Sequence, residues 1–299
     1  MSIDTTKACT DFQITEHLFS FQGFEYYVRV VPSREPVTVP IVMLGGSSQD
    51  RYTWPRHEER LIRAGTVITV DLPGYGNSDF LPSEFGLDFL ADALHYALDS
   101  LGHSAVNLMG ACYGGAVALR FTQRYPAAVR RLCLAGMILE VPEYYVKAVS
   151  RWTDLLGRGD RAGVARDLVD LFTSPPTAGT VRKHKVMSRI LFKQFMDRTD
   201  QGVRMDLEHS ARLLRHGMYA EGTLPDIPCL VFTGEHDILT PPHQGRKVAA
   251  LFPQAQFTTI KETDHLCGLE RVEETAELWA RFFSDQPYDD LGFFHPLEG

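Results

Sequence analysis

Several absences limit the class of protein to which this 299-residue chain can belong. No apolar run approaches the roughly 20 residues that a membrane-spanning helix needs, so we expect no membrane span. The segment Met1–Lys7 has no apolar core of the kind that a signal peptide carries. Positive charge is scarce, because the chain has 30 Lys and Arg against 38 Asp and Glu, a formal net charge of −8. This balance argues against a general nucleic-acid binder and against a protein that coats anionic membranes.

Cysteine is also scarce. The cysteines are odd in number and mostly lie in apolar segments, at Cys9, Cys112, Cys133, Cys229 and Cys267. Such a set indicates reduced thiols rather than a disulfide framework. We therefore expect a cytoplasmic protein.

What the chain does have is an alternation of short apolar segments with amphipathic ones. An antiparallel hairpin is predicted over residues 12–31, with Gln22-Gly23 near its turn. Further strands are predicted at 41–44, 66–70, 105–109, 131–135, 228–232 and 257–260, and helices at 85–101, 116–125, 243–251 and 272–283. This order predicts a mostly parallel sheet covered by helices on both faces.

The alternation stops after Glu140 and returns near residue 221. The intervening residues have helical spacing without a strand, over 144–156, 161–172, 181–196 and 203–214. We therefore divide the chain into an α/β core, residues 1–140 and 221–299, and an inserted helical lid, residues 141–220. Such a lid is expected over the carboxyl edge of the sheet, where these folds bind ligands.

Cys112 lies in the run Gly110-Ala111-Cys112-Tyr113-Gly114, between a predicted strand and a predicted helix. Gly-x-Cys-x-Gly at a strand-to-helix turn has the form of a nucleophile elbow with sulfur in place of the usual serine oxygen. The strained turn needs small neighbours, which Gly110 and Gly114 supply. The sulfur would lie at the positive end of the helix, which favours a thiolate.

Further motifs follow other predicted strands. Gly45-Gly46-Ser47 follows an early strand, Asp237 follows the strand at 228–232, and His265 follows the last strand. The stretch from Asp71 to Ser78 reads Asp-x-Pro-Gly-x-Gly-x-Ser, which predicts a shaped loop. Nucleophile, acid and histidine thus occur in the chain order of the α/β-hydrolase triad.

On these motifs the chain resembles the α/β-hydrolase superfamily over most of its length outside the lid. The resemblance implies that Cys112 is the nucleophile, His265 its base, and Asp237 the residue that orients the imidazole. It also implies an oxyanion hole made by the backbone N–H groups of Ser47 and Tyr113. No metal or organic cofactor is implied.

Alternatives stay open for some of these roles. Cys112 also fits a packed structural thiol. In some family members the acid follows the strand after the elbow helix, and Glu140 lies near that place. Asp264 is a poor candidate for the acid, since adjacent side chains rarely face each other.

Three residues depart from the family pattern. Cys112 replaces Ser, Gly45 replaces the usual His before the oxyanion glycine, and Asp264 replaces the usual Gly before the catalytic His. The charge of Asp264 is expected to favour the imidazolium and a thiolate–imidazolium pair. A cysteine nucleophile forms a thioester, which amines and alcohols attack readily, so sulfur favours acyl transfer from a thioester donor over plain ester hydrolysis.

The lid carries an excess of positive charge. From Arg182 to Arg215 there are nine Lys or Arg, against four acids: Arg182, Lys183, Lys185, Arg189, Lys193, Arg198, Arg204, Arg212 and Arg215 against Asp197, Asp200, Asp206 and Glu208. One interpretation is a solvated helix face. The other is a docking site for an acidic acyl-carrier protein or for the phosphates of coenzyme A.

More narrowly, the lid placement and C-terminal tail resemble 3-hydroxyacyl-transferase and thioesterase-like members of the superfamily. Those transferases carry Ser-Trp-Gly-Gly where this chain has Cys112-Tyr113-Gly114-Gly115. We expect acyl transfer through an acyl-cysteine intermediate, with a small-molecule acyl substrate that coenzyme A or a carrier protein delivers. The rival hypotheses are a hydrolase of an ester, lactone or carbon–carbon bond, and a non-catalytic ligand-binding member of the fold. The oligomeric state is not predicted.

Overall fold

A computed structural model of the chain describes residues 13–175 and 180–299. Three of the predictions above concern residues outside this description: the N-terminal segment Met1–Lys7, the thiol of Cys9, and the start of the hairpin at Phe12. The described residues form an eight-stranded sheet with the strand order β1-β2-β4-β3-β5-β6-β7-β8. The strands are β1 (Thr15–Phe21), β2 (Phe24–Val31), β3 (Ile41–Leu44), β4 (Val67–Asp71), β5 (Val106–Ala111), β6 (Val129–Ala135), β7 (Cys229–Gly234) and β8 (Ala255–Ile260).

The sheet is parallel from β4 to β8, and only the β1–β2 hairpin and the β2–β4 pair are antiparallel. Gln22 and Gly23 form the hairpin turn with positive φ values of 49° and 86°. Successive strand residues pack into opposite core layers, as the pleat requires. In β3, for example, Val42 and Leu44 belong to one apolar cluster, while Ile41 and Met43 belong to the other.

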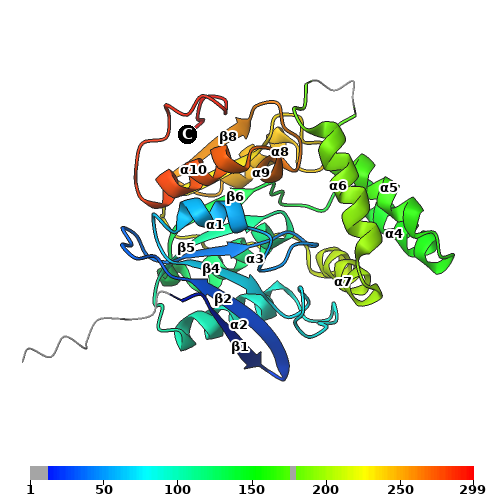
Figure 1. Cartoon of the computed structure of the whole chain (residues 1–299), viewed down its shortest axis with the longest axis horizontal. Coiled ribbons are helices and arrows are strands. Elements are labelled where there is room, and N and C mark those ends of the chain that lie inside the picture. Colours follow the sequence, from blue (N-terminus) through cyan, green and yellow to red (C-terminus); the bar gives the residue numbers. More distant parts are fainter. Residues whose placement is uncertain (1–12, 176–179) are drawn as a thin grey trace, which may run out of the picture.

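Helices cover both faces of this sheet (Figure 1). On one face lie α2 (Leu87–Ser100), α3 (Tyr113–Arg124) and α8 (Pro242–Ala249), whose buried residues share a cluster. On the other face lie α1 (Pro55–Leu61), α9 (Cys267–Glu270) and α10 (Val272–Phe283). A short 3-10 turn, η1 (Pro126–Ala128), follows α3. The C-terminal segment then returns along β8, where Phe294 and Glu298 form antiparallel bridges.

The helical lid lies between β6 and β7, beside the sheet in Figure 1. Its helices are α4 (Glu143–Gly157), α5 (Arg161–Phe172), α6 (His184–Asp197) and α7 (Asp200–His216). Helices α4, α5 and α6 share a small core around Trp152, with Val164 and Phe195 among its buried members. Among the described residues, no helix is both long enough and apolar enough to cross a membrane.

The predicted fold class is confirmed: this is an α/β-hydrolase fold with a mostly parallel sheet and an inserted run of helices. Two short helices, α1 and α9, were not predicted. Helix α1 reads Pro-Arg-His-Glu-Glu-Arg-Leu, which has too few apolar residues to show a periodic pattern. The division into core and lid at residues 141 and 220 stays a prediction.

The stretch from Asp71 to Ser78 forms a loop, as predicted. The Asp71 carboxylate is buried, accepts the Arg51 N–H at 2.7 Å and pairs with the Arg51 guanidinium. Gly74 and Gly76 have φ values of 93° and 51°, and a Cβ at Gly76 would collide with Asp71. Both positions therefore require glycine.

The turn between β5 and α3 depends on close backbone contact. A Cβ at Gly114 would lie 2.5 Å from the carbonyl oxygen of Gly45, and one at Gly110 would lie 2.7 Å from Ala118 Cβ. No real Cβ tolerates such distances, so α3 can approach β3 and β5 only because these residues are glycines.

Gly114→Ala is therefore expected to destabilise the protein by about 1–3 kcal/mol, the usual cost of overpacking a core. Thermal unfolding followed by circular dichroism measures the change. Gly157→Ala is the control, because nothing lies within 4 Å of a Cβ at that helical position and alanine favours helix. Equal melting temperatures for the two variants would contradict the packing argument.

Candidate active site

Cys112 occupies the turn between β5 and α3 with φ 51° and ψ −114°. A positive φ in a residue with a side chain costs about 1–3 kcal/mol and persists only where the surroundings impose it. Here the Cys112 N–H donates to the carbonyl of Ala135 at 2.8 Å, which ties the turn to the end of β6. The cysteine is partly exposed and lines a cavity whose walls come from both the core and the lid.

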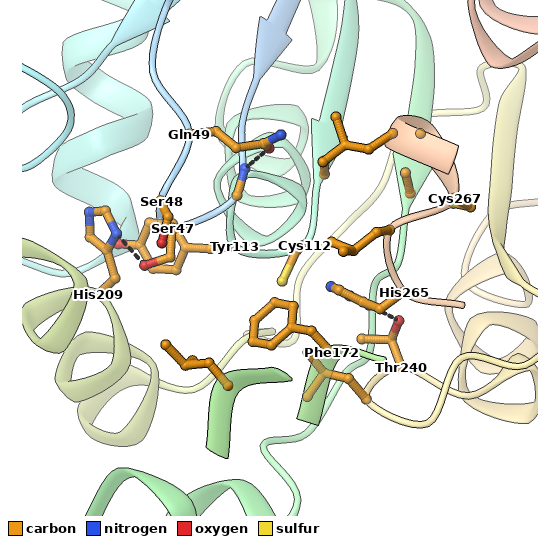
Figure 2. A pocket seen from close by; sticks show the side chains of 18 of the residues that line it. Ser47, Ser48, Gln49, Cys112, Tyr113, Phe172, His209, Thr240, His265 and Cys267 are labelled. Atoms are coloured by element: carbon orange, nitrogen blue, oxygen red, sulfur yellow. Dashed lines mark hydrogen bonds between the residues drawn. The ribbon is translucent and has the colours of Figure 1, made fainter. Parts of the chain in front are cut away.

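His265 and Asp237 lie next to each other on the loops that follow β8 and β7. The His265 Nδ1 atom is 2.9 Å from the Asp237 carboxylate and 3.2 Å from the Thr240 hydroxyl. The opposite side of the ring points toward the Cys112 sulfur (Figure 2). Phe172 of the lid packs edge-on against the ring, with centroids 5.1 Å apart.

The surroundings of Asp237 fix it as a carboxylate. It is buried, and its oxygens accept the N–H groups of Leu239 and Thr240 at 2.8 and 2.7 Å and the hydroxyl groups of Thr233 and Thr240. Burial raises the pKa of Asp237, but the charge of His265 and these hydrogen bonds outweigh burial and hold it below its usual range.

The pKa of His265 moves in the opposite direction. Burial lowers it, but the charges of Asp237 and Cys112, and hydrogen bonds with both, raise it well above its usual value. The imidazolium is therefore favoured between an acid and a sulfur, which is the electrostatic arrangement that a thiolate–imidazolium pair requires.

Glu140, the alternative acid, is exposed and does not line the cavity. The described hydrogen bonds of the His265 ring go to Asp237 and Thr240 instead. The geometry thus places Asp237, and not Glu140, against the histidine.

Ser47 and Tyr113, the predicted oxyanion residues, both line the cavity beside Cys112. Within the described residues, neither backbone N–H donates to a protein acceptor. The N–H of Gly46, which precedes Ser47, is instead occupied by the Gln49 side-chain oxygen at 2.7 Å. Two backbone N–H groups without a described protein acceptor therefore belong to residues that line the same cavity as Cys112.

Gln49 was not identified from the sequence. A Cβ at Gly45 would lie 2.8 Å from Gln49 Cβ, so glycine at this position makes room for Gln49 to fold back onto the loop (Figure 2). The replacement of the usual histidine by Gly45 is the signal in the sequence, but it does not say which side chain fills the space.

The cavity above Cys112 has a volume of about 180 Å³. Most of its lining is apolar, and the residues come from both core and lid: Trp54, Met109, Ile138, Val141, Leu168, Phe172, Leu191, Phe195, Leu213, Met218, Phe232, Leu239, Leu266 and Trp279. Arg198 is the only Lys, Arg, Asp or Glu in that lining. Among the described residues, no group of three or more His, Cys, Asp or Glu is placed to hold a metal ion.

Asp264, adjacent to His265, is fully buried and bonded to the backbone. Its carboxylate accepts the N–H groups of Leu266 at 3.2 Å and of Ser174 at 3.3 Å, while its own N–H donates to Glu270 at 3.0 Å. Burial raises the pKa of Asp264, and burial together with the Asp264 charge raises the pKa of Glu270 to about 8. At neutral pH the two carboxyl groups together therefore carry a negative charge smaller than two. The hydrogen bond from Ser174 connects this pair of acids to the lid.

Asp237→Asn is expected to lower kcat by roughly 10²–10⁴-fold, because the amide cannot supply the charge that favours the imidazolium. Glu140→Gln is the matched control and should change kcat less than twofold. Circular dichroism checks that both variants fold. The opposite ranking would move the acid to Glu140.

The comparisons with known proteins agree with this fold. Residues 39–272 match the alpha/beta hydrolase fold family. A dihydrolipoyllysine-residue acetyltransferase component of the acetoin cleaving system of Pseudomonas putida is 25% identical over 246 residues, which are 81% of this chain but only 63% of that protein. A pimeloyl-[acyl-carrier protein] methyl ester esterase of Neisseria meningitidis is 25% identical over 253 residues, 81% of this chain and 76% of the relative.

Among solved structures, an alpha/beta hydrolase enzyme, MGS-M2, from a Medee basin deep-sea metagenome library superposes with a TM-score of 0.77. It shares 18% sequence identity, and the match covers 91% of this chain and 99% of that one. The family match spans well over half of the chain. The protein therefore belongs to the alpha/beta hydrolase fold family.

Proposed function

We propose that the protein transfers acyl groups through a covalent acyl-cysteine intermediate on Cys112. The observation that supports this most directly is the series Cys112–His265–Asp237, in which the imidazole interacts with sulfur on one side and with a buried carboxylate on the other. The series opens into an apolar cavity with two free N–H donors beside the sulfur. This combination supplies nucleophile, base and oxyanion stabilisation in one place.

The proposed reaction has two half-reactions. The Cys112 sulfur attacks the acyl carbonyl and forms a tetrahedral oxyanion, which the N–H groups of Ser47 and Tyr113 stabilise. The intermediate collapses to a thioester on Cys112, and the leaving thiol or alcohol takes the proton from the His265 imidazolium. His265 then accepts the proton of the incoming acceptor, which attacks the thioester and restores the thiolate–imidazolium pair.

The cavity supports a small apolar acyl group as the substrate class. Its volume is below the roughly 300–1,000 Å³ of pockets for drug-sized ligands. Its apolar walls would leave a charged acyl group without partners at most points. Relatives named as an acetyltransferase component and as an ester hydrolase are compatible with transfer to a nucleophile and with transfer to water.

Hydrolysis of an ester or lactone is the second candidate, and the named esterase relative favours it. Product analysis with and without a thiol, amine or alcohol acceptor separates the two. Transfer predicts that an acceptor diverts product away from the free acid, whereas a hydrolase gives the same free acid at the same rate. A non-catalytic role predicts no turnover under any of these conditions.

The reduced thiols agree with the proposed cytoplasmic location. The described cysteines Cys112, Cys133, Cys229 and Cys267 are all free, and the last three are buried.

Only some of the nine Lys and Arg side chains between Arg182 and Arg215 are free to bind a ligand. Arg182, Lys193, Arg198 and Arg215 form ion pairs, and Arg212 is buried against backbone carbonyls and the Tyr113 hydroxyl. The remaining four cations are exposed and form no ion pair among the described residues: Lys183, Lys185, Arg189 and Arg204. We therefore propose that the first three, on and beside α6, bind the acidic part of a thioester donor, whether a carrier protein or coenzyme A.

Cys112→Ala is expected to abolish turnover, to below about 1% of the wild-type rate, because the variant lacks the sulfur that would carry the acyl group. Cys112→Ser should be slower than the wild type and give a larger share of hydrolysis, because the oxygen nucleophile needs base activation throughout. Steady-state kinetics with product analysis measures both effects, and circular dichroism checks the fold. Equal rates and product ratios for Ser and Cys would contradict the sulfur argument.

The paired reversal Lys183→Glu with Lys185→Glu is expected to raise KM for an acyl-thioester donor several-fold and to leave kcat nearly unchanged, since it removes binding and no transition-state contact. Added salt should have the same effect, because exposed charges are screened within about 10 Å at 0.1 M ionic strength. A short aryl ester is the control and should respond to neither change. The same response for both substrates would assign the cluster to a solvated face.

A further inference from the structure

One buried side chain of the lid, His209 of α7, contacts both residues of the proposed oxyanion hole. Its Nδ1 atom is 2.8 Å from the Ser47 hydroxyl oxygen. Its ring is stacked on the Tyr113 ring, with centroids 4.3 Å apart and an interplanar angle of 17°. Figure 2 shows His209 on the side of Tyr113 and Ser47 that is remote from His265. His209 is only 1% exposed, so these contacts are not transient surface encounters.

The neighbours of His209 reinforce the same connection. Arg198 donates to the Ser48 carbonyl at 3.4 Å, and Asp206 accepts the Ser48 hydroxyl at 3.3 Å. Arg212, one turn after His209, donates to the Tyr113 hydroxyl at 2.8 Å. Residues of α7 and of the α6–α7 connection thus form hydrogen bonds and ring contacts with both the loop after β3 and the first residue of α3.

His209 is held as a neutral imidazole. Burial and the charges of Arg212 and Arg198 lower the pKa of His209 well below its usual value. A neutral ring has one donor and one acceptor nitrogen, so its contact with Ser47 is a directional hydrogen bond rather than a charge interaction. A directional bond on one side and a stacked face on the other fix the ring relative to both residues.

We propose that His209 is a positioning residue that holds the N–H groups of Ser47 and Tyr113 at the spacing the oxyanion requires. This inference rests on the proposed acyl-transfer function and extends it, because it makes the lid part of the catalytic apparatus as well as the wall of the cavity. His209 does not touch the reacting atoms. It acts through the two loops that carry the donors, where small displacements are costly because the donors stabilise charge only at hydrogen-bonding distance.

The test separates oxyanion stabilisation from nucleophile reactivity. Alkylation of Cys112 by iodoacetamide needs the thiolate but forms no oxyanion, whereas turnover of an acyl ester needs both. His209→Phe keeps an aromatic ring for stacking on Tyr113 and removes the nitrogen that bonds Ser47. Ser47→Ala removes the other partner of that bond and keeps the backbone N–H.

Each variant is expected to lower kcat by roughly 10–100-fold, less than the 10²–10³-fold that loss of a whole oxyanion donor costs. The alkylation rate should stay within about twofold of the wild type. The double variant should lose no more than either single variant, because both remove the same bond. His216→Gln, on the same helix but exposed, is the matched control and should change neither rate.

Three results would overturn the proposal. Normal kcat in Ser47→Ala would show that the bond to His209 positions nothing. A parallel fall in alkylation and turnover would show a general structural defect. Additive losses in the double variant would show that the two residues act separately. Failure of the proposed function itself appears differently, as wild-type protein whose Cys112 is alkylated but which turns over no acyl ester.

Discussion

The chain passes from β5 into α3 through a single residue held at a positive φ, and the surrounding structure is arranged to hold that turn in place. Gly110 and Gly114 allow the backbones of β3, β5 and α3 to approach closely. The Ala135 carbonyl fixes the Cys112 N–H from the neighbouring strand. The result is a sulfur raised above the carboxyl edge of the sheet, at the start of a helix and at the floor of an apolar cavity. That turn places the sulfur close to both the histidine and the free N–H donors.

Two groups of residues approach the turn from opposite sides. On one side, the loops after β7 and β8 bring a buried carboxylate and an imidazole to the sulfur, and Ser174 of the lid bonds to Asp264 next to that imidazole. On the other side, the loop after β3 and the start of α3 provide the N–H donors, and His209 of α7 contacts both. The lid therefore contacts each half of the site separately.

The features that the sequence predicted are those set by local pattern and chain order. The β3 strand is an uninterrupted apolar run, and helices α5 and α10 have helical spacing of apolar residues; all three were predicted at their observed bounds. Cys112, Asp237 and His265 each follow a strand of one parallel sheet, so their side chains meet at its carboxyl edge. Gln49, His209 and the Asp264–Glu270 pair were not identified as partners, because each depends on a contact whose geometry no spacing encodes. The same limit applies to the lid cations, whose ion pairs reach residues as distant in sequence as Glu84 and Glu274.

In the proposed function, Cys112 carries the acyl group during turnover. Intact-protein mass spectrometry of the wild-type protein, quenched in acid after brief incubation with a panel of acyl-thioesters, tests it most directly. We expect a mass increase of one acyl group for a donor with a small apolar acyl chain. Peptide mapping should locate it on Cys112, and addition of an acceptor should remove it. Turnover of the same thioester without any covalent adduct, or an adduct on a different residue, would show that Cys112 does not carry the acyl group.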